Sequence, residues 1–221
     1  MKALIFDLDG TLVDTVYPHV FTWQATFAEA GIPVEGWRIH RRVGMSGGVF
    51  IRSLMRECGY EISEQQTNAL TKRHLEMYKE MHPVRQLLPG AKDLLKFLRE
   101  NKIIHGIATS GSEEEIGPSL KALEVPDDMV VVCKKDGGRP KPEPDLFLTC
   151  QKKLKVKKEE CYAVGDSTWD ILSARRAGML GVGITTGGYD DEELIGAGAF
   201  RVYPDTKTFH RSLEELGFEM R

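Results

Sequence analysis

Short apolar runs recur along the chain and predict the strands of one sheet. They lie at residues 3–6, 103–108, 129–132, 162–164, 181–184 and 199–203. Their length, and the lack of polar alternation within them, are typical of strands buried on both faces. After residue 90, segments with apolar residues at three- and four-residue steps separate these runs and predict helices. This alternation predicts an α/β fold with a doubly wound parallel sheet.

Residues 15–82 show no strand pattern and predict helices throughout. Apolar residues recur at helical steps after Val16 and again after Val49, and Ser63 is a predicted N-cap of a further helix. We therefore expect a small all-helical cap, residues 15–82, inserted after the first strand. The core would consist of residues 1–14 and 83–221, and two connections between the parts are compatible with a hinge.

Composition narrows the possible functions. The 221 residues carry a net charge of -3 and 41% hydrophobic residues, which is typical of globular proteins. Without a basic excess or an apolar run of membrane-spanning length, neither nucleic acid nor a membrane is an expected partner. The four scattered cysteines lack zinc-site spacing, and the chain starts directly in a strand rather than in a signal peptide. We expect a cytoplasmic protein, a monomer or a weak homodimer.

Two aspartates follow the first predicted strand. Asp7 and Asp9 are separated by one residue, so in an extended chain they share a side. Two carboxylates held close together raise each other's pKa unless a cation lies between them. A calcium loop would need Gly and Glu at its sixth and twelfth positions, where this chain has Leu12 and Pro18. By itself the segment is also compatible with a turn that carries two solvated acids.

The segment Asp7-Leu8-Asp9-Gly10-Thr11-Leu12-Val13-Asp14 resembles the first motif of the haloacid dehalogenase-like phosphohydrolases. Three later segments resemble the other motifs in the family's order: Ala108-Thr109-Ser110-Gly111, Lys141-Pro142-Glu143-Pro144-Asp145 and Gly165-Asp166-Ser167-Thr168-Trp169-Asp170. All four lie where predicted strands end or in the loops that follow, which is where open α/β sheets bind ligands. The resemblance covers nearly the whole chain. It implies a Rossmann-like core with a helical cap, in the subgroup of phosphoglycolate phosphatases and β-phosphoglucomutases.

The resemblance implies a role for each motif residue. Asp7 would attack phosphorus and form an aspartyl-phosphate. Asp9 would protonate the leaving oxygen and then activate the hydrolytic water. Lys141 would tie the nucleophile to the phosphoryl oxygens. The phosphate would also be bound by Thr11, Thr109 and Ser110.

A divalent cation is also implied, because Asp7 and the phosphate are both anionic. Hard oxygen ligands favour Mg²⁺. The resemblance implies Asp7, the backbone carbonyl of Asp9 and Asp166 as ligands, with Asp170 one helical turn further on. Considered alone, Asp166 and Asp170 would equally be an N-cap and a first-turn acid of a helix.

Several residues of the predicted cap are candidates for substrate contacts. His19 lies about one turn beyond Asp14, and a structural role is equally compatible with that position. Arg41 and Arg42 precede a glycine-bearing turn where relatives present a specificity loop, and an arginine there would suit a carboxylate or second phosphate. The expected contacts are His19, Arg41, Ser46 and Gly47, while Trp23, Phe27 and Trp37 are expected in the cap core.

Two enzymatic functions and one other class remain open. Gly165-Asp166-Ser167 with Asp170 has the phosphatase form of the fourth motif, whereas sugar phosphomutases of this type carry Glu-Asp-Ser. We therefore predict a Mg²⁺-dependent phosphatase acting on a small phosphorylated metabolite, with a sugar phosphomutase as the alternative. Dehalogenases lack the second acid, which is present here as Asp9. A phospho-receiver domain would be about half this length and would have no cap.

Overall fold

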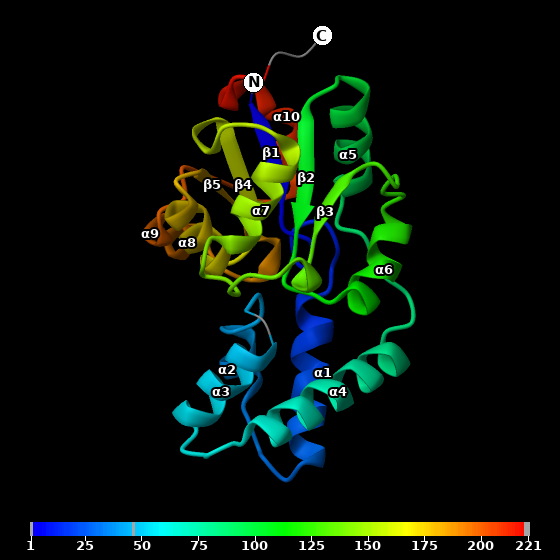
Figure 1. The fold of residues 1–221 in the computed structure, drawn as a ribbon, viewed down its shortest axis with the longest axis vertical. Helices are drawn as coiled ribbons and strands as arrows, with labels where there is room; N and C mark the ends of the chain where they lie inside the picture. The colour runs from blue at the N-terminus through cyan, green and yellow to red at the C-terminus, as the bar shows by residue number, and fades with distance from the viewer. Residues whose placement is uncertain (1, 46, 219–221) are drawn as a thin grey trace.

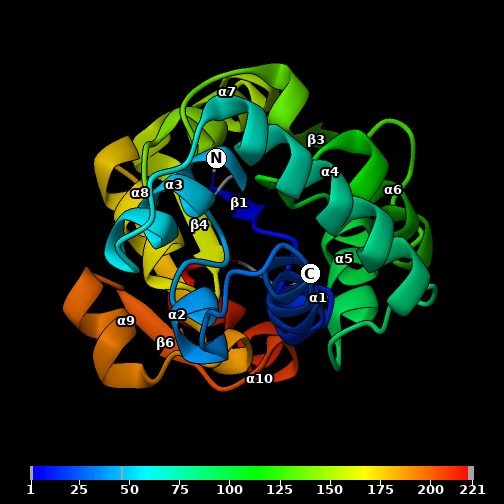
Figure 2. The ribbon, with the colours of Figure 1, turned by 90° about the horizontal axis from the view of Figure 1, so that it is seen from below.

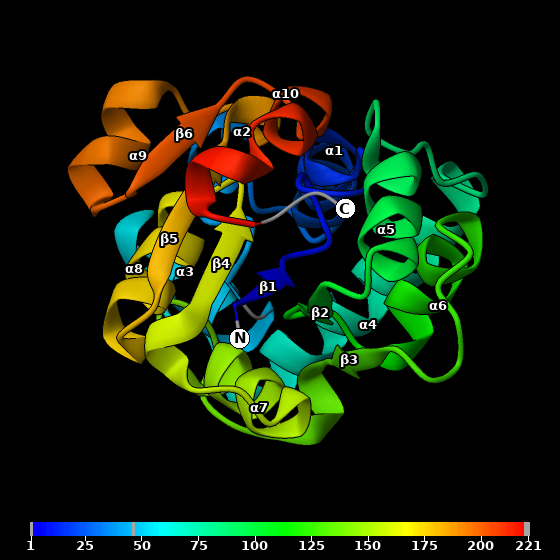
Figure 3. The ribbon, with the colours of Figure 1, turned by 90° about the horizontal axis from the view of Figure 1, so that it is seen from above.

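The computed structural model describes residues 2–45 and 47–218, which form a six-stranded parallel sheet flanked by helices. The strands are β1 (Ala3–Phe6), β2 (Ile104–Ala108), β3 (Val130–Val132), β4 (Cys161–Gly165), β5 (Leu180–Ile184) and β6 (Arg201–Tyr203). Their spatial order is β3-β2-β1-β4-β5-β6 (Figure 3). The predicted doubly wound α/β fold is thereby confirmed, and the strand ends differ from prediction by one or two residues.

The helices fall into a group before β2 and a group that alternates with the strands. They are α1 (Val16–Glu29), α2 (Gly36–His40), α3 (Gly47–Glu57), α4 (Glu64–Met81), α5 (Ala91–Glu100), α6 (Glu113–Ala122), α7 (Asp145–Leu154), α8 (Thr168–Ala177), α9 (Asp191–Ala197) and α10 (Thr206–Arg211). Within the described residues, none of these helices combines the length and the apolar character needed to cross a membrane.

The central strand β1 is buried on both faces. Leu4 and Phe6 belong to one hydrophobic cluster, which α5, α6 and α10 complete. Ala3 and Ile5 belong to a second cluster on the opposite face, with α7 and α8. Side chains alternate between faces along a strand, so a fully apolar β1 supplies both layers.

The strand register brings the sequence motifs to one edge of the sheet. Phe6 is aligned with Ile107 of β2 and Val164 of β4. The chain runs from β1 to one side through β2 and β3, and to the other side through β4, β5 and β6. Ligands bind in α/β folds at such a switch in strand order, beyond the carboxyl ends of the strands.

The helices α1 to α4 lie beyond this edge of the sheet (Figure 1), around the end of β1 when seen from below (Figure 2). They have a hydrophobic cluster of their own, built around Phe27, Ile39 and Leu54. The two connections to the sheet lie side by side, since Val13 bridges Leu87 in antiparallel fashion.

Two details of this helical segment differ from the sequence-based expectation. The short helix α2 was not predicted. Trp37 on α2 is not in the core: it is 60% exposed, and the Arg38 guanidinium lies 4.6 Å from its ring centroid. A five-residue helix has too few positions for apolar periodicity to show which side faces inward. Trp23 and Phe27 are buried as expected.

Candidate active site

Three carboxylates from separate motifs converge beyond the ends of β1 and β4. Asp7, Asp166 and Asp170 are all buried, and each offers an oxygen within 4.8 Å of the other two. Asp7 continues the sheet, because its N–H donates to the Val164 carbonyl at 2.8 Å. Asp170 is held in the first turn of α8 by a capping box with Ser167, whose backbone N–H donates to Asp170 Oδ2 at 3.1 Å.

Lys141 places an ammonium group inside this cluster. Its Nζ donates to Asp7 Oδ1 and lies 2.7 Å from Asp170 Oδ1. The side chain is 1% exposed. Burial by itself lowers the pKa of a lysine, but the Asp170 and Asp7 charges outweigh burial and raise the pKa of Lys141 above its usual value. The lysine is therefore charged at every physiological pH.

One ammonium does not balance three carboxylates. Burial, together with the charges of Asp170 and Asp9, raises the pKa of Asp7 to about 7 although Lys141 opposes the shift. Burial, then Asp170 and Asp7, raises the pKa of Asp166 well above its usual value. Carboxylates that resist ionisation in this way become stable anions when a cation lies between them. The cluster could hold a divalent cation, and its all-oxygen donor set suits a hard one.

Two glycines, Gly10 and Gly187, pack closely against the Asp166 carboxylate. A Cβ on Gly10 would lie 2.4 Å from Asp166 Oδ2, and one on Gly187 would lie 1.8 Å from it. Gly10 also has a φ of 82°, which favours glycine. Thr11 Oγ1 donates to Asp166 Oδ1 at 2.8 Å. The predicted phosphate ligand Thr11 is thus fully buried, with its hydroxyl on Asp166.

Asp9 lies apart from the carboxylate cluster, on the side of a cavity. Its Oδ1 accepts a hydrogen bond from Thr15 Oγ1 at 2.6 Å and lies 3.9 Å from His19 Nε2. Its Oδ2 lies 3.5 Å from Thr109 Oγ1. The Asp7 side chain therefore belongs to the carboxylate cluster, whereas the Asp9 side chain contacts Thr15, His19 and Thr109. The resemblance assigns only the backbone carbonyl of Asp9 to a cation.

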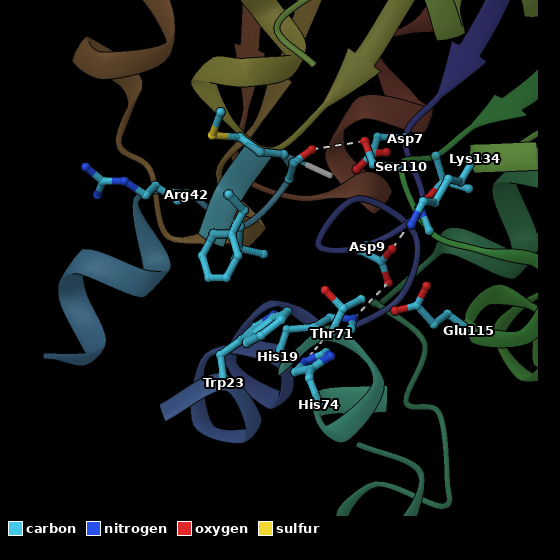
Figure 4. A pocket seen from close by; sticks show the side chains of 16 residues that line it. Asp7, Asp9, His19, Trp23, Arg42, Thr71, His74, Ser110, Glu115 and Lys134 are labelled. Carbon is cyan, nitrogen blue, oxygen red and sulfur yellow. Dashed lines mark hydrogen bonds and ion pairs between the residues drawn. The ribbon is translucent and has the colours of Figure 1, made fainter. Parts of the chain in front are cut away.

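A cavity of about 90 Å³ separates the strand ends from the helical segment (Figure 4). The sheet side contributes Asp7, Asp9, Thr109, Ser110, Gly111, Glu115 and Lys134. The opposite side contributes His19, Trp23, Arg42, Val43, Gly44, Met45, Phe50, Thr71 and His74. One wall is thus charged and polar, and the other is largely aromatic and apolar.

The histidines of the second wall are stacked and uncharged near neutral pH. His19 Nδ1 lies 3.4 Å from His74 Nε2. The His19 ring stacks on Tyr78 at 4.1 Å between centroids, and His74 stacks on Trp23 at 3.9 Å. Burial lowers the pKa of His19, and burial followed by the His19 charge lowers the pKa of His74 to well below its usual value. These rings can exchange hydrogen bonds with a ligand without adding charge.

Arg41 lies outside the cavity and joins the helical segment to the sheet side. Its carbonyl accepts hydrogen bonds from Trp169 Nε1 at 3.0 Å and from the Tyr189 hydroxyl at 3.2 Å. Its guanidinium pairs with Glu193 at 2.5 Å. Nearby, His40 Nε2 lies 2.8 Å from the Gly187 carbonyl. Arg41 therefore joins two parts of the chain, and its expected contact with substrate stays a prediction.

The other predicted residues have different outcomes. Thr109 and Ser110 line the cavity, and Ser110 Oγ donates to the Gly44 carbonyl at 3.1 Å. Ser46 lies outside the described residues, and Gly47 begins α3. Sequence reasoning did not single out six lining residues: Val43, Gly44, Phe50, Thr71, His74 and Lys134. Glu115, which closes the capping box at the start of α6, was not among the predicted site residues either, because no local pattern indicates which helix positions meet across a cavity.

Comparisons with known proteins agree with the fold and the motifs. A sequence model of the family described as haloacid dehalogenase-like hydrolase matches residues 1–178. The chain is 32% identical to β-phosphoglucomutase of Bacillus subtilis, over 89% of this chain and 87% of that one. It is 28% identical to phosphoglycolate phosphatase 1 of Pseudomonas aeruginosa, over 84% and 70%. The crystal structure of a hydrolase from Pseudomonas syringae, 41% identical, superposes with a TM-score of 0.94 over 98% of this chain and 99% of that chain. The chain belongs to the haloacid dehalogenase-like hydrolase family.

Proposed function

We propose that the protein is a Mg²⁺-dependent phosphatase that hydrolyses a small organic phosphate monoester through an aspartyl-phosphate on Asp7. The observation that carries this proposal is the environment of Asp7. One oxygen is bound by Lys141, the carboxylate belongs to a buried acidic cluster, and the residue still lines the cavity. A nucleophile at a closed, charged strand end facing a cavity suits attack on a phosphoryl group.

The residues of the chain divide the reaction between them. Lys141 holds Asp7 Oδ1, which leaves Oδ2 to form a bond to phosphorus as the bond to the leaving oxygen breaks. Asp9 donates a proton to that leaving oxygen and then takes one from the water that attacks the aspartyl-phosphate. Thr109 and Ser110 face the transferred group. Asp7, Asp166 and the Asp9 carbonyl would hold a Mg²⁺ ion, which would supply positive charge to the phosphoryl group.

Residues 15–82 are proposed to act as a cap on a core of residues 1–14 and 83–221. The separate hydrophobic cluster of α1 to α4 supports this division. So does the pairing of Val13 with Leu87, which places both connections at one point where a hinge can form. A closed cap would exclude water from the cavity and so strengthen the electrostatic interactions with the phosphate.

A sugar phosphomutase is the second candidate, because the chain is 32% identical to a β-phosphoglucomutase. Such an enzyme must hold a second phosphate while the first is transferred. Arg42, a lining residue, has its guanidinium in an ion pair with Glu57, and it donates to the Arg38 carbonyl at 3.0 Å. Arg41 pairs with Glu193 outside the cavity. Hydrolysis needs no second phosphate site and therefore agrees better with these contacts.

Phosphate release from a panel of monoesters, measured with and without a bisphosphate primer, tests the proposal. We expect inorganic phosphate without a primer, and a phosphoryl adduct on Asp7 in acid-quenched samples analysed by mass spectrometry. Primer-dependent isomerisation of a hexose phosphate would instead identify a mutase. An adduct on any other residue would reject Asp7 as the nucleophile. The cytoplasmic location and the monomeric or weakly dimeric state remain predictions.

A further inference from the structure

We propose that the site selects monoesters whose leaving group is a short, uncharged, hydroxyl-bearing chain, and that Glu115 excludes leaving groups that carry a carboxylate. This inference rests on the proposed phosphatase function and concerns the part of the cavity beyond the phosphoryl group. It identifies Glu115, on the first turn of α6, as a specificity-determining residue.

The basic residues around the cavity are poorly placed to receive a second anionic group. Among the described lining residues, Arg42 and Lys134 are the ones with a positively charged side chain. Arg42 is engaged by Glu57 and by the Arg38 carbonyl. Lys134 is exposed to solvent at the cavity edge, where an ion pair contributes little. A carboxylate on the substrate would therefore lose water without gaining a buried cation.

Glu115 adds a negative charge on the sheet side of the cavity. Its Oε2 accepts hydrogen bonds from the Ser112 backbone N–H at 2.8 Å and from Ser112 Oγ at 2.6 Å. This capping box fixes the side chain, and the carboxylate faces the cavity (Figure 4). Within the described part of the chain, no hydrogen bond or ion pair involves the other oxygen, Oε1. A substrate hydroxyl can donate to Oε1, whereas a substrate carboxylate would be repelled by Glu115.

The helical wall on the opposite side is suited to aliphatic groups of a ligand rather than to charged groups. Trp23 and Phe50 line it with ring centroids 4.9 Å apart, and both are almost fully buried. His74 and His19 add polar ring nitrogens, and His19 Nδ1 lies 3.4 Å from His74 Nε2. The cavity volume of about 90 Å³ favours a short leaving group. Aliphatic carbons against the rings and a hydroxyl toward Glu115 satisfy both walls.

Matched substrate pairs test this selection. In the first pair, 2-hydroxyethyl phosphate has a CH₂OH group where phosphoglycolate has a carboxylate. In the second, glycerol 3-phosphate is compared with 3-phosphoglycerate. We expect kcat/KM to favour the uncharged member of each pair by at least about tenfold, mostly through KM. Equal values, or a preference for the carboxylate, would overturn the proposal.

Glu115→Gln tests the residue itself. Glutamine keeps the capping box but removes the charge, so the fold of α6 is retained. The preference for the uncharged member should fall about fivefold or more. Glu113→Gln, in the same helical turn but exposed and paired with Lys135, is the matched control and should leave the preference unchanged. A preference that Glu115→Gln does not alter would remove Glu115 from the selection.

Binding measurements separate this proposal from the proposed function. Calorimetry of both esters with the Asp7→Asn variant compares their affinities without turnover. If the variant binds the uncharged ester selectively but the parent protein hydrolyses no monoester, the phosphatase proposal is refuted and the proposed substrate preference stands. If the parent protein hydrolyses both esters and the variant binds them equally well, the phosphatase proposal stands and the proposed substrate preference is refuted.

Discussion

The two walls of the cavity differ in chemistry and in origin. The sheet wall contains Asp7, which is buried and accepts a hydrogen bond from the Lys141 ammonium group. The helical wall contains Trp23, Phe50 and His74, which are aromatic and uncharged near neutral pH. The first wall follows from where parallel strands end, and the second from how four helices pack against that edge.

This difference suggests a division of labour. The phosphoryl group is common to all monoesters, and the sheet wall matches its charge. The leaving group varies, and it is the helical wall, together with Glu115, that surrounds it. Substitutions of the sheet-wall residues that meet the phosphoryl group should therefore affect every substrate alike. Substitutions of Glu115 or of the helical wall should act on KM and on substrate preference.

The largest effect is expected for Asp7→Asn. An amide oxygen is a poor nucleophile, and the acyl-phosphate cannot form, so turnover of every monoester should fall at least about a thousandfold. Phosphate release and circular dichroism measure activity and folding separately. Asp14→Asn changes an exposed aspartate of the same motif and should stay within about twofold of the parent protein. Residual activity of a few per cent in Asp7→Asn would contradict the assignment.

The acidic cluster predicts a stability that depends on both pH and cation. With burial raising the pKa of Asp7 to about 7, the folded protein retains a proton that the unfolded chain releases near its reference value of 3.8. Without a cation, stability should therefore fall as pH rises from about 4 to about 7. At a hundred times its Kd, Mg²⁺ should add about 2.7 kcal/mol, or roughly 5–10 °C in Tm.

Thermal unfolding at several pH values checks this prediction. The Mg²⁺-induced rise in Tm should be larger at pH 7.5 than at pH 5, because protons compete with the cation for the carboxylates. Asp166→Asn should remove most of the rise. Asp128→Asn, on the exposed surface, should leave it intact. A rise that is the same in Asp166→Asn and in the parent protein would place the cation elsewhere.

The sequence predicted the position of the sheet-wall acids because that position follows from recognising each strand in its own local pattern. Asp7 and Asp166 each follow an apolar strand, and the ends of parallel strands must meet at one edge. The helical wall offered no comparable rule. Arg41 was expected to contact substrate, but it meets Tyr189 and Glu193, which lie about 150 residues further along the chain. His74 lies on a helix whose apolar pattern does not indicate which partner it will stack against.

The smallest effect is expected where the helical wall is joined to the sheet wall. Trp169→Phe combined with Tyr189→Phe removes two hydrogen bonds to the Arg41 carbonyl and keeps an aromatic ring at each position. At about 1 kcal/mol for each bond, the docked arrangement weakens and KM should rise about fivefold to thirtyfold, with a smaller change in kcat.

Two controls sharpen this last comparison. Trp37→Phe alters an exposed tryptophan on α2 and should leave KM unchanged. Lys79→Ala removes an exposed ion pair between α4 and Glu114, and its effect should stay below about twofold because such pairs contribute little in water. If Lys79→Ala raised KM as much as the double variant, the two walls would be held together by the α4 side, and the Arg41 contacts would be incidental to enclosing the substrate. The structure favours the Arg41 side, because its hydrogen bonds are partly buried and the neighbouring His40 reaches the carbonyl of Gly187, which packs on Asp166.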